Sequence, residues 1–199
     1  ARLGSACQKR QMWPVAQSCF LAWALLEPEH PTPWWELATL AQREGRTHDA
    51  VAFYSRILAV MPEHEDALWN LGLLCYQTGQ LPLALWCFEQ GVLLNPGNAL
   101  LLLNFAALLL QHGSLERAEE ALAMALPLGT EQASILYTLG EVHHRRGKFQ
   151  AAIQAYSQAL AEDPQHSLSL RRLGSLLFQE KYPKEAGDAF LHLVLLDPG

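Results

Sequence analysis

The stretch of sequence that decides the fold is EDALWNLGLLCYQTGQLPLALWCFEQGVLLNPGN, residues 65–98. Its first part places Leu68, Leu71 and Cys75 at the i, i+3 and i+7 spacing that gives a helix one apolar side. A turn with glycine follows, and the Leu-Pro pair after it suits the first turn of a second helix, where proline's missing N–H costs nothing. Pro96 then ends the second helix. These signals predict two antiparallel helices joined by a short turn.

The same pattern returns every 34 residues without an insertion or deletion. Residues 1–30 fit the frame as a partial unit, and the full units are 31–64, 65–98, 99–132, 133–166 and 167–199. The twentieth position is always alanine: Ala16, Ala50, Ala84, Ala118, Ala152 and Ala186. The eighth is always small: Gly4, Ala38, Gly72, Ala106, Gly140 and Gly174. A repeat of this length predicts an all-α solenoid of stacked helical hairpins.

The small positions explain how the two helices of a hairpin approach each other. We expect the eighth and twentieth positions to face one another, with the larger residues at positions seven and twenty-four filling the space beside them. Pro127 and Gly129 interrupt the unit 99–132, so its second helix should end early. Lys181 replaces the glycine that ends the first helix in most units. The last helix leaves an apolar side open, which predicts that the chain continues past Gly199.

Composition limits the classes of protein that fit. Hydrophobic residues make up 50% of the chain and charged residues 17%, which excludes an intrinsically disordered chain. The net charge of −6 repels phosphate backbones, so we do not expect a nucleic-acid partner. No stretch is apolar and long enough to predict a membrane-spanning helix. A targeting signal upstream of Ala1 would lie outside this sequence.

The four cysteines fill repeat-equivalent positions instead of forming a metal cluster. The pairs Cys7/Cys75 and Cys19/Cys87 are each two repeat periods apart, so we expect buried free thiols and no zinc site. Free thiols favour a reducing compartment such as the cytoplasm.

The repeat resembles the tetratricopeptide repeat (TPR) family. The resemblance rests on Trp34-x-x-Leu37, Leu71-Gly72, Ala84-x-x-x-Phe88 and Pro96, with their counterparts in the other units. It implies a right-handed superhelical solenoid of antiparallel helix pairs that forms a single domain over residues 1–199. It also implies an adaptor or scaffold that binds proteins, although the family serves many pathways.

In this family the first helix of each hairpin lines a concave groove, mainly through positions 2, 5, 6, 9, 12 and 13. Asn70 and Asn104 occupy position six of adjacent units and resemble the asparagine ladder of the repeat region of O-linked N-acetylglucosamine transferases. An amide can both donate to and accept from the backbone of an extended peptide. The predicted partner-binding residues are Trp35, Trp69, Asn70, Tyr76, Asn104, Tyr137, Arg145, Arg171 and Arg172.

Each of these predictions has a structural alternative. The asparagines and aromatic residues could simply stabilise neighbouring helices. The arginines would suit an acidic peptide or a free carboxylate, but they could instead form a solvated patch paired with Glu141. The lysine and asparagine set of the chaperone-binding members of the family is not present in order, so the sequence does not support docking of chaperone C-terminal tails.

The sequence contains no catalytic motif, and we expect neither an enzyme activity nor a cofactor. His143 and His144 point about 100° apart on a helix, which does not suit one metal ion. We therefore predict a packed histidine followed by a surface one. Three hypotheses for function remain: a scaffold that binds an extended peptide in its groove; the recognition arm of a larger glycosyltransferase or sulfotransferase; and an array that self-associates through the open side of its last helix.

Overall fold

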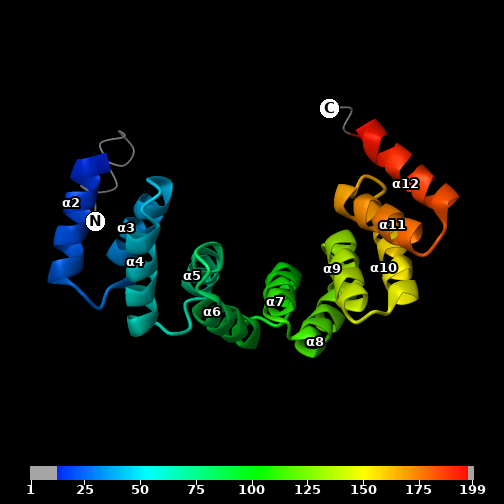
Figure 1. Ribbon diagram of the computed structural model, residues 1–199. Helices are drawn as coiled ribbons and strands as arrows, with labels where there is room; N and C mark the ends of the chain where they lie inside the picture. The colour runs from blue at the N-terminus through cyan, green and yellow to red at the C-terminus, as the bar shows by residue number, and fades with distance from the viewer. Residues whose placement is uncertain (1–12, 197–199) are drawn as a thin grey trace. The chain divides into compact units, whose positions relative to one another are not determined.

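The computed structural model describes residues 13–196, and within this range all regular structure is helical (Figure 1). The helices are α2 (Trp13–Leu26), α3 (Pro31–Arg43), α4 (Thr47–Val60), α5 (Glu65–Gln77), α6 (Leu81–Leu94), α7 (Ala99–His112), α8 (Leu115–Ala125), the short 3-10 helix η1 (Leu126–Leu128), α9 (Gln132–Arg145), α10 (Phe149–Glu162), α11 (Ser167–Gln179) and α12 (Pro183–Leu196). The predicted all-α hairpin architecture is therefore confirmed.

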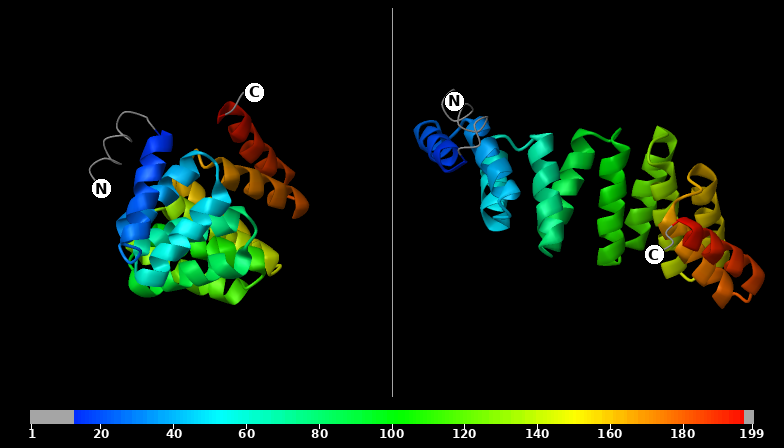
Figure 2. Two further views of the ribbon diagram at one scale, coloured as in Figure 1. Left: turned by 90° about the vertical axis from the view of Figure 1, so that its left-hand side faces the viewer. Right: turned by 90° about the horizontal axis from the view of Figure 1, so that it is seen from above.

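The helices pair in chain order, and the chain divides into two compact units. Residues 1–94 contain α2 and the hairpins α3/α4 and α5/α6, and α4 also packs on α5. Residues 95–199 contain the hairpins α7/α8, α9/α10 and α11/α12, joined by contacts of α8 with α9 and of α10 with α11. Figure 2 shows α11 and α12, in orange and red, side by side at the end of the second unit. The continuous single domain over residues 1–199 stays a prediction.

The first helix of most hairpins begins at a repeated polar cap. The residue before each of α3, α5, α7 and α11 accepts a hydrogen bond through its side chain from a backbone N–H of the first turn, and these residues are His30, His64, Asn98 and His166. Such a bond satisfies one of the N–H groups that a helix start leaves without a partner. Asparagine is a usual N-cap residue and histidine is not, so the role of the three histidines was not predicted.

The turns inside the hairpins follow the glycine pattern. Gly45, Gly79, Gly113 and Gly147 all adopt positive φ, between 71° and 84°, as the left-handed helix end requires. Lys181 takes the same conformation in the last hairpin, with φ 67°. The second helix of the third hairpin ends at Ala125 and gives way to η1, which Gly129 closes with φ 75°. The early end predicted from Pro127 and Gly129 is confirmed.

The core contains the repeated alanines, and the small eighth positions lie close to large side chains of the second helix. All six alanines at position twenty are buried, with at most 1% exposure: Ala16, Ala50, Ala84, Ala118, Ala152 and Ala186. Gly72, Gly140 and Gly174, at position eight, lie against the ring at position twenty-four of the same hairpin. A Cβ at Gly174 would have ring atoms of Phe190 as its three nearest neighbours, and Gly72 faces Phe88 and Cys87. At these hairpins the small eighth position therefore makes room for the large residue predicted at position twenty-four, and the direct contact between positions eight and twenty stays a prediction.

Cys19, Cys75 and Cys87 are free thiols, and Cys7 lies outside the described residues. Burial raises the pKa of the Cys87 thiol to about 12, so it behaves as an apolar core residue. Among residues 13–196, no helix is long and apolar enough to cross a membrane.

Candidate peptide-binding surface

The two asparagines at position six adopt the same conformation in their own units. Asn70 donates from Nδ2 to the carbonyl oxygen of Asp66 at 2.7 Å, and Asn104 donates to that of Leu100 at 2.8 Å. Each bond runs four residues back along the helix and fixes the amide, which is half-buried. The carbonyl oxygen and the second N–H of each amide take no part in this bond, so each asparagine keeps one acceptor and one donor.

The aromatic residues of the first unit pack against the second helix of their own hairpins. Trp35 contacts the ring of Tyr54 edge-on, with 5.5 Å between centroids, and stacks on the N-cap His64 at 5.5 Å. Trp69 meets Phe88 edge-on at 5.9 Å. Trp35, Trp69 and Tyr76 are all only partly exposed. Edge-on contacts of this kind stabilise the hairpin, as the structural alternative expected, and they also fix the exposed part of each ring.

In the second unit, Tyr137 belongs to a buried polar cluster. Its ring lies 5.9 Å from that of Tyr156 and 5.4 Å from the N-cap His166. Tyr156 donates its hydroxyl hydrogen to the carboxylate of Glu141 at 2.6 Å, and burial, together with that carboxylate, raises the pKa of Tyr156. Glu141 is itself 8% exposed, so its charge requires a partner.

Arg172 supplies that partner. Its Nε lies 2.9 Å from Oε1 of Glu141 and its Nη2 lies 3.1 Å from Oε2, which is a two-point contact with the carboxylate. The hydrogen bond of Arg172 with the Tyr137 hydroxyl is the main factor that raises the arginine's pKa. The alternative predicted from sequence, in which the arginines pair with Glu141, is therefore correct for Arg172.

The other two predicted arginines differ from each other. Arg145 donates from Nη1 to the carbonyl oxygen of Leu110 at 2.6 Å, in the last turn of α7. The same carbonyl also accepts from the backbone N–H of Gly113. A cation at the C-terminal end of a helix interacts favourably with the helix dipole, so this arginine joins two consecutive hairpins. Arg171 is exposed, and within residues 13–196 no ion-pair or hydrogen-bond partner contacts its side chain.

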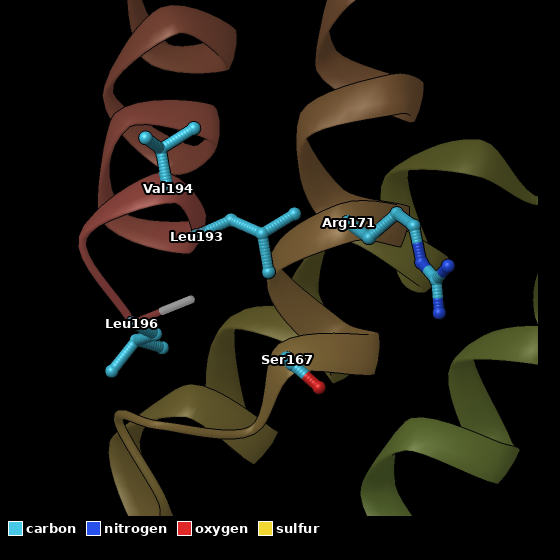
Figure 3. A pocket seen from close by; sticks show the side chains of 5 residues that line it. All are labelled: Ser167, Arg171, Leu193, Val194 and Leu196. Atoms are coloured by element: carbon cyan, nitrogen blue, oxygen red, sulfur yellow. The ribbon is translucent and has the colours of Figure 1, made fainter. Parts of the chain in front are cut away.

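Three surface hollows occur near the start of a first helix. One of about 310 Å³ in the first unit is lined by Pro31, Thr32, Trp35, His64 and Asp66. In the second unit, one of about 400 Å³ has an acidic lining that includes Glu131, Glu162 and Asp163. The third, of about 430 Å³, lies between α11 and α12 (Figure 3) and is lined by Ser167, Arg171, Leu193, Val194 and Leu196. These repeat-related places therefore differ in chemistry.

In the pair His143 and His144, the first has a buried ring nitrogen and the second contacts a neighbouring aromatic ring. Nδ1 of His143 is buried and has no hydrogen-bond partner among the residues that the structure describes, and burial lowers the pKa of His143. His144 contacts the ring of Phe149 at 5.7 Å. No group of three or more possible metal ligands occurs in the part of the chain that the structure describes.

The hairpin pairing, the caps and the repeat length define a helical-repeat protein. Tetratricopeptide-repeat family models match residues 35–92 and 133–166. These segments are therefore tetratricopeptide repeats, and the predicted family of the repeats is confirmed. The resemblance of the asparagines to O-linked N-acetylglucosamine transferases stays a prediction.

Solved structures support the same fold. A tetratricopeptide-repeat protein from Parabacteroides merdae has a TM-score of 0.78 at 16% identity, with 97% of this chain and 80% of that chain covered. MamA from Desulfovibrio magneticus RS-1 gives 0.76 at 18% identity, with 84% and 95% covered. YrrB, described as a TPR protein with an unusual peptide-binding site, gives 0.71 at 17%, with 90% and 92% covered. At these identities the likeness concerns the fold. No curated protein sequence matches the chain significantly.

Proposed function

We propose that this protein is a scaffold that binds an extended segment of a partner protein along the first helices of its repeats. The tetratricopeptide fold is typical of protein–protein interaction scaffolds, most of which are not enzymes. The observation that carries the proposal is the matched state of Asn70 and Asn104. Each amide is oriented by one bond to its own helix and keeps a donor and an acceptor for a peptide backbone.

The amides suit a backbone ligand because of their chemistry. An extended peptide presents one N–H and one carbonyl per residue, and an amide can pair with both. Such contacts hold a chain without reading its side chains, so sequence preference must come from neighbouring residues. Trp35, Trp69 and Tyr76 are partly exposed aromatic residues of the kind that dominate protein interfaces.

The test removes both amides. A random dodecapeptide library displayed on phage is selected on the wild-type chain, and the enriched peptides are synthesised and titrated. Asn70→Ala with Asn104→Ala should weaken every enriched peptide by about tenfold or more, the loss expected for two backbone hydrogen bonds. Helical content should not change, because alanine favours the helix.

The matched control is Gln154→Ala with Gln158→Ala, which removes two exposed amides from the second helix α10. These substitutions should leave the affinity unchanged. Equal losses for the two double variants, or no loss for the asparagine variant, would overturn the role of the ladder.

A second candidate function is self-association through α12. Leu191, Val194 and Leu195 are 60%, 60% and 72% exposed. Leu58, at the repeat position of Val194, is only 7% exposed, and its helix α4 packs against α5. An apolar side of this kind favours contact between copies. Sedimentation velocity over a hundredfold concentration range should show mass increasing for the wild type and not for Leu191→Lys with Leu195→Lys. A constant wild-type mass would exclude this function.

A further inference from the structure

The first helices α9 and α11 of the second unit use their surface residues in different ways. On α9, Tyr137, Glu141 and Arg145 all have partners inside the unit, as described above. These residues are therefore not free to change partner without a loss of stability. If this unit recognises side chains of a ligand, other residues must do so.

The exposed row on α11 consists of Leu168, Arg171, Ser175 and Phe178. Their spacing of three, four and three residues places them on one side of the helix. Leu168 is 40% exposed and Phe178 is 67% exposed, an unusual state for an aromatic residue in water. Ser175 donates its hydroxyl hydrogen to the backbone carbonyl of Arg171 at 2.9 Å, a contact that does not involve the guanidinium.

The guanidinium of Arg171 is positioned to meet a ligand. Arg171 is one of the residues that line the hollow between α11 and α12, and Figure 3 shows its guanidinium extending away from Leu193 and Val194 of α12. The neighbouring Arg172 already neutralises Glu141. A guanidinium that has no partner among residues 13–196 and is flanked by exposed apolar side chains has the charge and shape to bind a carboxylate whose neighbours are apolar.

We propose that the α11 row selects a peptide segment in which an acidic residue and a large apolar residue stand about three positions apart. This inference rests on the proposed function and adds the chemistry of the partner. Arg171 and Phe178 are two helical turns apart, roughly 10 Å along the axis. A polyproline-type extended peptide covers about 9 Å in three residues and returns to the same side. The carboxylate therefore pairs with Arg171 while the apolar side chain covers Phe178.

The experiment repeats the phage selection in parallel on four forms of the full chain: wild type, Arg171→Glu, Phe178→Ser and Lys184→Glu. Lys184 is an exposed cation on α12, so its variant makes the same charge change away from the row. The wild-type and Lys184→Glu pools should be enriched in Asp or Glu with an apolar residue three positions away. The Arg171→Glu pool should lose the acidic residue, and the Phe178→Ser pool should lose the apolar one.

Synthetic peptides from the wild-type pool give the quantitative test. Arg171→Glu should weaken them by about tenfold or more, as expected for the loss of a charge-assisted contact, while circular dichroism shows the fold unchanged. A wild-type pool with no acidic bias, or one that Arg171→Glu does not alter, would overturn the α11 row and leave the scaffold function standing. A selection that enriches no peptide on the wild type would overturn both.

Discussion

Two buried tyrosines occupy the same repeat position in the two units, and their hydroxyl groups are satisfied in different ways. Tyr54 donates to the neutral amide of Gln42 at 2.5 Å within its own hairpin. Tyr156 donates to the carboxylate of Glu141, which also binds Arg172 of the next hairpin. The first arrangement stabilises one hairpin, whereas the second connects two.

The ionic contacts of the two units differ in the same way. In the first unit, Arg46 pairs with Glu44 and Asp49, its neighbours in the chain. In the second, Arg146 on the α9 side pairs with Glu116 and Glu119 of α8. The second unit therefore uses charge to hold successive hairpins together, which makes its interior sensitive to the loss of a single carboxylate.

The largest effect is expected from Glu141→Ala. The change leaves the Tyr156 hydroxyl buried without an acceptor and Arg172 without its carboxylate, and should cost about 2–3 kcal/mol of unfolding free energy. The half-exposed Arg172 can turn to solvent, so the cost stays below that of a fully buried pair. Urea unfolding followed by circular dichroism measures the change.

The conservative variant separates the two parts of that loss. Glu141→Gln keeps an acceptor for Tyr156 and removes the charge, and should cost about 1 kcal/mol. If Glu141→Ala were as stable as the wild type, the cluster would not connect the hairpins energetically.

The glycine behind the second tyrosine gives the next effect. A Cβ at Gly140 would lie 2.6 Å from Cδ1 of Tyr156, so Gly140→Ala must displace a ring that Glu141 holds in place, at a cost of about 1–3 kcal/mol. At Gly72 the nearest atom is Cε2 of Phe88 at 3.2 Å, and the gain in helix propensity offsets the strain. Thermal unfolding should therefore show a clear loss for Gly140→Ala and little change for Gly72→Ala.

The repeat frame could be predicted from sequence because its signals are local. Glycine at the turn indicates a backbone with positive φ, and alanine at position twenty indicates a place with room for only a small side chain. The first helices begin within one residue of the predicted units. A tyrosine at position twenty-four also indicates a buried hydroxyl. Its partner could not be predicted, because Tyr54 uses position twelve and Tyr156 uses position nine.

The candidate site shows the same limit. The sequence places the arginines on the first helices, but it cannot show which of them already has a partner. Arg145 binds a backbone carbonyl of another hairpin and Arg172 binds a buried carboxylate, and both contacts depend on how the hairpins pack. The N-cap histidines, by contrast, could have been found, since His30, His64 and His166 recur at one position of the repeat.

A smaller effect is expected in the first unit. Gln42→Ala removes a neutral acceptor near the surface and should cost about 1 kcal/mol in urea unfolding, because water can replace the amide. Burial raises the pKa of Tyr54 to about 12. The pKa of Tyr54 is therefore higher in the folded protein than in the unfolded chain. The stability that the protonated hydroxyl contributes is complete below about pH 10 and is lost as the pH rises towards 12.

Absorbance at 295 nm follows the phenolate and checks this titration. Tyr54→Phe should remove one of the tyrosines that ionise only at strongly alkaline pH. If the late phase is unchanged in Tyr54→Phe, the Tyr54 hydroxyl is not protected as the contact with Gln42 implies.

The smallest effect concerns His143, a second titratable group in the interior of the second unit. Burial lowers the pKa of His143 below its ordinary value near 6.5, so the folded state favours the neutral ring. The stabilisation is therefore present above about pH 6.5 and is lost as the pH falls, because the unfolded chain binds the proton first.

His143→Leu should remove this part of the acid dependence, a few tenths of a kcal/mol, and should also relieve the unpaired Nδ1. Urea midpoints measured at pH 7.5 and pH 5.5 for both proteins test the point. A pH dependence identical in the variant and the wild type would show that this histidine does not contribute to the acid dependence of the unit's stability.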